Sequence, residues 1–198
     1  MHKGDMGRLA ILAGCESYSG ASVIAELGAS AFALGDGLVK LCVPDCILYP
    51  VMSKITECTL LSMPSKNGGL AFSEDYLEKA IRGANAVLYG NGVDVTEDTA
   101  RILSYLIEKV EVPLVLDADA LNALSYSPDL LRKRSAPTVL TPHPKEFSRL
   151  MNTSNIIRAV FSTNSMCFLW DLYLFAIWRA ADIRYLSGAN GALRPSCV

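Results

Sequence analysis

Short apolar segments alternate with longer helical patterns along most of the chain, and this alternation limits the folds that the sequence can adopt. Each apolar segment has the length of a buried strand and stops at a glycine, a proline or an aspartate. The segments are Leu9–Ala13, Leu38–Val43, Thr59–Met63, Ala86–Tyr89, Pro113–Leu116 and Thr138–Thr141. Because strands separated by helices form crossover units, we expect a three-layer α/β/α fold around a mostly parallel, doubly wound sheet.

The segments between these strands show apolar faces at helical spacing and residues that are typical of helix N-termini. Ser19–Leu34 is apolar on nearly every side, which predicts a helix sandwiched between layers. Ser73 stands in the capping position of a second helix, which has two acidic residues in its first turn. Asp94 and Glu97 have the spacing of a capping box before a third helix.

The composition fits a folded chain without a nucleic-acid or membrane partner. Of the 198 residues, 51% are hydrophobic and 19% are charged, which argues against disorder. A formal net charge of −2 provides no electrostatic footprint for nucleic acid or an anionic membrane. None of the six cysteines forms a C-x-x-C pair and only two histidines are present, so we expect no zinc site. Reduced thiols and a cytoplasmic location fit this pattern.

Two apolar runs need to be distinguished from export or membrane segments. Leu9–Ala13 is too short for the hydrophobic region of a secretory signal. Met166–Trp178 contains Asp171 and is shorter than the ~20 residues that cross a bilayer as a helix. We therefore interpret the first run as a strand and the second as a core helix.

Candidate site residues follow the strands, because ligands of doubly wound folds bind at the carboxyl ends of the strands. Two such loops contain paired glycines, Gly14–Ala21 and Gly90–Gly92. Glycine permits a positive φ and a close approach of backbone to ligand. The first loop is not a phosphate-binding Walker loop, because no Lys-Ser/Thr pair follows Gly20. Ordinary turns remain an alternative for both loops.

Two aspartates follow the strand at Pro113–Leu116. Asp117 ends the strand, and a carboxylate there could hold magnesium, usually through water. We expect Asp119 to cap the short helix Ala120–Leu124.

His143 lies between two prolines at the last strand end. Pro142 forces the residue before it to be extended, so the strand stops cleanly. Pro144 fits the first position of a helix, where its missing N–H is not needed. His143 is thereby held at the positive end of a helix, where a neutral ring offers one donor and one acceptor to a ligand.

Taken together, these stretches resemble the NAD(P)H-hydrate dehydratase family, which has a ribokinase-like fold. The matching pieces occur in the family's order and span about residues 2–151. They are His2–Gly7, Leu12–Ala21, Gly35–Leu41, Tyr89–Gly92, Val115–Leu124 and Leu140–Leu150.

The resemblance implies a repair enzyme that uses ADP or ATP, with magnesium, to dehydrate the hydrate of NADH or NADPH. The hydroxyl group of the hydrate is phosphorylated, and phosphate then leaves to restore the double bond. By this similarity, Ala21, Gly92 and His143 would contact the hydrate. Glu146 and Arg149 would line the same pocket. From its place at a strand end, and not from the resemblance, we expect Asp117 near the phosphate and magnesium. A homo-oligomer is compatible with the resemblance.

The last part of the chain departs from the family. The family has a Gly-Thr-Gly-Asp element near its C-terminus, in which the aspartate acts as base and backbone N–H groups stabilise the phosphate. This element is absent from the sequence. We therefore divide the chain into residues 1–151, the substrate-binding part of a ribokinase-like domain, and an atypical segment 152–198. A truncated or frame-shifted tail would produce this pattern, and Asp171 and Asp182 are the first candidates to replace the missing base.

Smaller departures lie at Cys15, where the family usually has serine, at Asn91, where it commonly has proline, and at Lys145, often a glycine.

Three hypotheses about function follow from the resemblance and from these departures. The chain is a dehydratase by descent, whether active or inactive as written; it is a ribokinase-like kinase of a small hydroxymethyl compound; or it is a non-catalytic remnant that still binds the dinucleotide.

Overall fold

The computed structural model describes residues 7–32 and 37–150, and its centre is a six-stranded sheet in which every pairing is parallel. The strand order is β3-β2-β1-β6-β7-β8. The strands are β1 (Arg8–Leu12), β2 (Leu38–Pro44), β3 (Thr59–Met63), β6 (Ala86–Tyr89), β7 (Leu114–Leu116) and β8 (Thr138–Leu140). Each bound lies within one residue of the sequence-based expectation, and the parallel, doubly wound sheet is confirmed.

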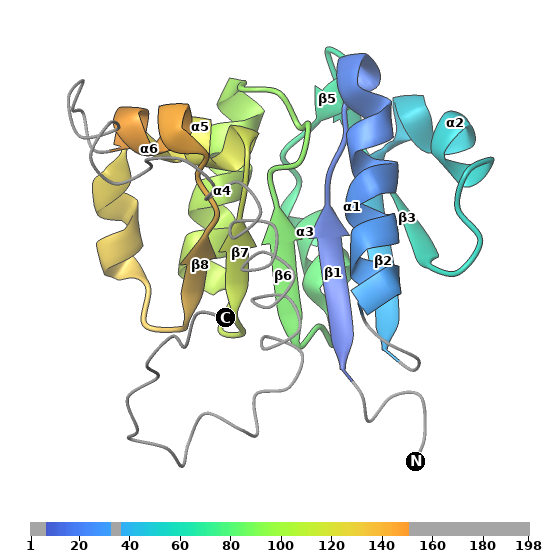
Figure 1. Cartoon of the computed structure of the whole chain (residues 1–198), viewed down its shortest axis with the longest axis horizontal. Helices are drawn as coiled ribbons and strands as arrows, with labels where there is room; N and C mark the ends of the chain where they lie inside the picture. Colours follow the sequence, from blue (N-terminus) through green and yellow to red (C-terminus); the bar gives the residue numbers. More distant parts are fainter. Residues whose placement is uncertain (1–6, 33–36, 151–198) are drawn as a thin grey trace, which may run out of the picture.

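Helices cover both faces of this sheet (Figure 1). The helices are α1 (Ser19–Phe32), α2 (Leu48–Met52), α3 (Glu74–Ile81), α4 (Glu97–Lys109), α5 (Asp119–Leu124) and α6 (Pro144–Leu150). Residues of α3, α4 and α5 share one apolar core with alternate strand residues such as Ala10 and Leu12. Residues of α1 and α2 share the other core with Leu9 and Ile11. The three-layer α/β/α arrangement is therefore confirmed.

Shorter elements connect the layers. They are the 3-10 turns η2 (Glu16–Tyr18), η3 (Asp45–Ile47) and η4 (Pro128–Lys133), and an antiparallel pair made by β4 (Ser65–Lys66) and β5 (Gly69–Leu70).

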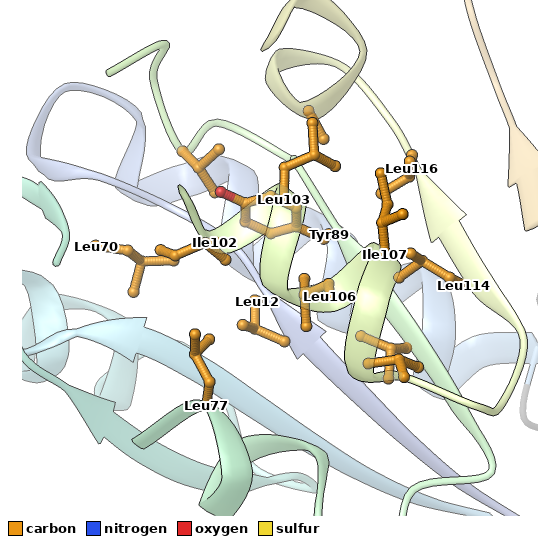
Figure 2. Packing of buried hydrophobic residues seen from close by; sticks show 14 of the residues in the cluster. Leu12, Leu70, Leu77, Tyr89, Ile102, Leu103, Leu106, Ile107, Leu114 and Leu116 are labelled. Carbon is orange, nitrogen blue, oxygen red and sulfur yellow. The ribbon is translucent and has the colours of Figure 1, made fainter. Parts of the chain in front are cut away.

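Tyr89 is the largest side chain in the core beneath α4 (Figure 2). Its ring is fully buried near Leu12, Leu103 and Leu106. Its hydroxyl group donates to the carbonyl oxygen of Thr99 at 3.1 Å, which satisfies the buried polar atom. Burial also raises the pKa of Tyr89, so the phenol stays neutral.

The expectation that α1 is sandwiched between layers is wrong. The helix buries Val23, Ala25 and Ala29 against the sheet. Ile24 and Leu27 point away from it and are 62% and 55% exposed within the described part of the chain. The error arises because an apolar residue can lie on a surface, so an all-round apolar pattern does not fix the number of covered sides.

The capping expectations were partly wrong. Thr96, not Asp94, caps α4, and its side chain accepts from the backbone N–H of Thr99 at 3.1 Å. Asp94 instead adopts a left-handed conformation with φ of 64°. Ser73 occupies the N-cap position of α3 as expected, but its side chain makes no capping hydrogen bond.

Within the described residues, β8 is the last strand on one side of the sheet. Its three residues are all half-buried, whereas those of the neighbouring β7 are fully buried. None of the helices in the described ranges has the length and hydropathy needed to cross a membrane. The predicted core helix at Met166–Trp178 and the candidate bases Asp171 and Asp182 lie outside the described residues.

Ala118 is strained at the turn between β7 and α5. Its φ of 47° and ψ of −114° lie in a region that side chains with a Cβ rarely adopt. The turn is closed by the backbone N–H of Ala120, which donates to the carbonyl oxygen of Asp117 at 3.1 Å. The strain is thus held by the packing of the strand against the following helix.

We expect Ala118→Gly to stabilise the protein by about 1 kcal/mol. Relief of about 1–3 kcal/mol of backbone strain outweighs the roughly 0.5–1 kcal/mol that glycine loses in conformational entropy. Urea unfolding measures the change. The control Ala100→Gly, at an exposed position inside α4, should destabilise by about 1 kcal/mol. A destabilised Ala118→Gly variant would contradict the strained turn.

Candidate functional site

The strand order reverses between β1 and β6, because β2 and β3 extend the sheet on one side and β7 and β8 on the other. Ligands of doubly wound folds bind at the carboxyl edge near such a reversal. The loops that follow β1 and β6 meet there, where the N–H of Gly14 donates to the carbonyl oxygen of Asn91 at 2.9 Å. This junction is the candidate functional site.

Gly92 and Ala21 lie against each other at the junction. A Cβ added to Gly92 would lie 2.6 Å from the Cβ of Ala21 and 2.9 Å from that of Tyr18. The φ of Gly92 is +64°, which also favours glycine. The expected close approach at Gly92 is thus present between two segments of the chain.

Gly90 is constrained even more strongly. Its φ is +127°, and an added Cβ would lie 1.9 Å from the carbonyl oxygen of Asp117. A side chain at this position would collide with backbone, which cannot move aside like the end of a flexible side chain. The loop after β6 therefore needs both glycines for packing, in addition to any role toward a ligand.

Asp117 connects three strand ends. The side chain of Asn91, which follows β6, donates from Nδ2 to Oδ2 of Asp117 at 2.8 Å. The hydroxyl group of Thr141, which follows β8, donates to Oδ1 at 2.8 Å. The carboxylate thereby fixes the loops after β6, β7 and β8 relative to one another. Thr141 was missed by the sequence analysis, although its place directly before Pro142 marked the strand end.

The charge of Asp117 is supported by neutral donors. Burial raises the pKa of Asp117, whereas the hydrogen bonds from Thr141, the backbone of Ala118 and Asn91 lower it. No lysine or arginine side chain in the described residues forms an ion pair with this carboxylate. Three donors thus share the two carboxylate oxygens of Asp117. The described residues contain no group of three or more metal-binding side chains.

His143 caps α6 with its own ring. Its Nδ1 accepts from the backbone N–H of Lys145 at 3.1 Å, so this atom carries no proton. Its Nε2 lies 3.1 Å from Oε1 of Glu146. The other oxygen of Glu146 accepts from the backbone N–H of His143 at 2.9 Å, which completes a reciprocal cap. The expected donor and acceptor are thus both engaged by α6, while the half-exposed ring remains open to a ligand.

Glu146 is the buried partner in this pair. Only 6% of the residue is exposed, and this burial raises the pKa of Glu146. The contacts with His143 act in the opposite direction, and the negative charge of Asp117 raises the pKa further. Glu146 therefore holds both the backbone and the ring of His143, each through one carboxylate oxygen.

Arg149 and Asp119 form a second chain of contacts beside the site. Arg149 donates from Nη1 to the side-chain oxygen of Asn122, which joins α6 to α5.

Asp119 is the first residue of α5 and not its cap, so that expectation is wrong by one position. Its carboxylate instead accepts from the backbone N–H of Asp94 at 3.0 Å and anchors the loop after β6.

The predicted site residues thus form two groups joined by Asp117. Ala21 contacts Gly92 on one side, and His143 contacts Glu146 on the other. Asn91 precedes Gly92 and Thr141 lies two residues before His143, so the Asn91–Asp117–Thr141 bonds connect the groups. Arg149 lies further along α6 and points to α5. That all of them line one substrate pocket remains a prediction.

The chain belongs to the NAD(P)H-hydrate dehydratase family, whose model matches residues 9–166. It is 35% identical over 156 residues to the bifunctional NAD(P)H-hydrate repair enzyme Nnr of Moorella thermoacetica, covering 77% of this chain and 29% of that protein. It is 32% identical over 153 residues to Nnr of Escherichia coli K12, covering 77% of this chain and 27% of that protein. The chain thus spans less than a third of the length of these curated relatives.

Solved structures agree with the fold. A ribokinase-like superfamily protein from Enterococcus faecalis V583 superposes with a TM-score of 0.65 at 20% identity, covering 88% of this chain and 57% of that one. The ADP/ATP-dependent NAD(P)H-hydrate dehydratase of Bacillus subtilis, co-crystallised with ATP/Mg²⁺ and soaked with CoA, has a TM-score of 0.55 at 25% identity. That match covers 75% of this chain and 49% of the relative. The ribokinase-like expectation is confirmed.

Gly92→Ala should destabilise the protein by about 3 kcal/mol. The left-handed conformation contributes about 1–2 kcal/mol, and the collision with Ala21 and Tyr18 adds an overpacking term of similar size. The matched control is Gly20→Ala, which meets no atom within 4 Å and should stabilise α1 by up to about 1 kcal/mol. Equal effects of the two substitutions on urea unfolding would refute the close approach at Gly92.

Thr141→Val should raise the pKa of Asp117 further, because the hydroxyl group favours the charged carboxylate. Near neutral pH the variant should lose about 1.5 kcal/mol of unfolding free energy. This loss should shrink as the pH falls through the raised pKa of Asp117, since the protonated acid needs the donor less. Carboxyl ¹³C NMR and urea unfolding measure the two effects. The exposed Thr59→Val serves as control, and a pH-independent loss in Thr141→Val would contradict the assignment.

Proposed function

We propose that the chain binds the hydrate of NADH or NADPH at the junction of the β1 and β6 loops. The observation that carries the proposal is the packing of Gly92 on Ala21 at the point where the strand order reverses. Ligands of doubly wound folds bind at this edge, and the missing side chain of Gly92 brings the two loops that would line the site into direct contact. Membership of the dehydratase family supports the same ligand.

His143 would contact the bound hydrate from the opposite side. Its ring is pinned by α6 through Lys145 and Glu146, so it would lose little freedom on binding. Asp117 would hold the β6 and β8 loops at a fixed separation while the ligand binds. The role of these residues is therefore to shape and orient the substrate site.

For the reaction we propose a dehydration that depends on ADP or ATP and magnesium, as the name of the Bacillus subtilis relative states for that enzyme. The nucleotide would supply the phosphoryl group that converts the hydroxyl into a leaving group. Asp117 is the described carboxylate suited to a hydrated magnesium ion. The sequence lacks the Gly-Thr-Gly-Asp element to which the resemblance assigns the base and the phosphate donors.

The proposed function also implies the class of partner and the cellular location of the protein. The partner would be a small molecule and not nucleic acid, in line with a net charge of −2. Four of the cysteines, at positions 15, 42, 46 and 58, are free thiols in the described part of the chain, which supports the reducing cytoplasm. A homo-oligomer remains part of the proposal.

Titration with the hydrate of NADH tests the proposed ligand. We expect the chain to bind it and His143→Asn to bind it about two- to tenfold more weakly, because the half-exposed ring would pack against the hydrate while α6 engages both of its nitrogens. Asparagine is a good helix cap, so this variant keeps α6 while it removes the ring. The exposed Arg132→Ala should bind as the unmodified chain does. A chain that fails to bind the hydrate would overturn the proposal.

Turnover is a separate test. General-base help contributes about 10²–10⁴-fold and each phosphate donor about 10²–10³-fold in rate. Without the expected element, the chain with magnesium and ADP or ATP should convert the hydrate well below ~1 s⁻¹. Turnover at or above that rate would mean that a residue such as Asp171 or Asp182 replaces the missing base.

A further inference from the structure

A second hollow lies at the opposite edge of the sheet, among the residues that begin the strands. Its volume is about 260 Å³. It is lined by the first residues of β1, β2 and β3 and by the turn that follows α3, namely Arg8, Leu9, Ala10, Leu38, Val39, Lys40, Thr59, Arg82 and Ala84. The proposed hydrate site lies at the other ends of these strands, so the two sites are separate.

The lining of this amino-edge pocket is basic. Among the described residues, it contains Arg8, Lys40 and Arg82 and no acidic side chain. The guanidinium group of Arg8 lies beside the same turn that carries Arg82, since its Nη1 would be 3.3 Å from a Cβ added to Gly83. Like charges gathered in one hollow repel each other unless an anion lies between them.

The two arginines differ from others in the described part of the chain. Arg101 and Arg132 form ion pairs with aspartates, and Arg134 donates to backbone carbonyl oxygens. Within the described ranges, no ion pair or hydrogen bond involves the guanidinium groups of Arg8 and Arg82. Among the described residues, no group competes with a ligand for these donors.

Lys40 fixes the geometry of the pocket. Its ammonium group donates to the carbonyl oxygens of Lys79, Ala80 and Arg82 at 3.0, 3.2 and 3.3 Å. These bonds hold the last turn of α3 against β2, and with it the backbone that carries Arg82. The positive charge of Lys40 thus sits at a defined place in the wall of the pocket.

We propose that the amino-edge pocket binds a diphosphate group through Arg8 and Arg82. Arginine presents a planar fork of donors that matches phosphate oxygens, and the side chain of Thr59 supplies a further hydroxyl. At about 30 Å³ for each water-sized group, the volume holds roughly nine such groups, the number of heavy atoms in a diphosphate. The diphosphate could be inorganic or part of a nucleotide. This proposal does not depend on the proposed dehydratase function.

The test is a titration of the isotopically labelled full chain with inorganic pyrophosphate, followed by backbone amide NMR. We expect the amide signals of Thr59, Gly83 and Ala84 to shift. Arg8→Gln and Arg82→Gln should each weaken binding about tenfold, as expected for the loss of a hydrogen bond to a charged group. Arg132→Gln, which alters an exposed ion pair with Asp129, should leave the affinity unchanged.

A parallel titration with ADP distinguishes the two sources of the diphosphate. Tighter binding of ADP than of pyrophosphate at the same amides identifies a nucleotide ligand, and the reverse identifies inorganic diphosphate. Shifts confined to Gly92 and its neighbours would overturn the proposal, because they would place the anion at the carboxyl edge. Unchanged affinity in both arginine variants would overturn it as well. The hydrate titration of His143→Asn reports on the other site alone, so the two proposals fail independently.

Discussion

The site depends on one buried carboxylate, that of Asp117, which joins loops from three strands. Asn91 and Thr141 each donate to a different oxygen of this group at 2.8 Å. Three neutral donors, the third being the backbone of Ala118, compensate only part of the burial, which is why the pKa of Asp117 remains raised. The buried carboxylate and the strained turn at Ala118 beside it are both unfavourable in free energy. They fix the positions of the loops that carry the site. Asn91 precedes Gly92 and Thr141 precedes the histidine cap, so this carboxylate connects the two groups of site residues.

Much of the fold could be predicted from local sequence patterns. Buried parallel strands are short, apolar and bounded by turn residues, so Thr59–Met63 and Ala86–Tyr89 have the predicted bounds without any information on their neighbours. The same strand pattern places Gly92, Asp117 and His143 at strand ends. In a doubly wound sheet, ligands bind at that carboxyl edge. The resemblance to a family then added roles that the pattern alone could not assign.

The remaining features depend on contacts between distant segments. Asp94 has the right spacing for a cap, but its N–H is bound by Asp119 from another loop, and Thr96 takes the capping position. The nitrogens of His143 were expected to face a ligand, yet the first turn of α6 engages both. Ile24 lies on the open side of α1 because only the fold decides which side of a helix is covered. Sequence spacing records which groups could pair, and the tertiary arrangement selects among them.

The central position of β1 also bears on how the chain folds as it is synthesised. On one side β1 pairs with β2, which follows soon after it, but on the other Leu9 pairs with Ala86. Until β6 has left the ribosome, one edge of an apolar strand presents unpaired N–H and C=O groups, a template for association with other nascent chains. Long-range parallel pairing is also slow to form. The emerging chain therefore has an aggregation-prone edge on β1 until Tyr89 has left the ribosome, and the far edge of β6 then stays open until β7 follows.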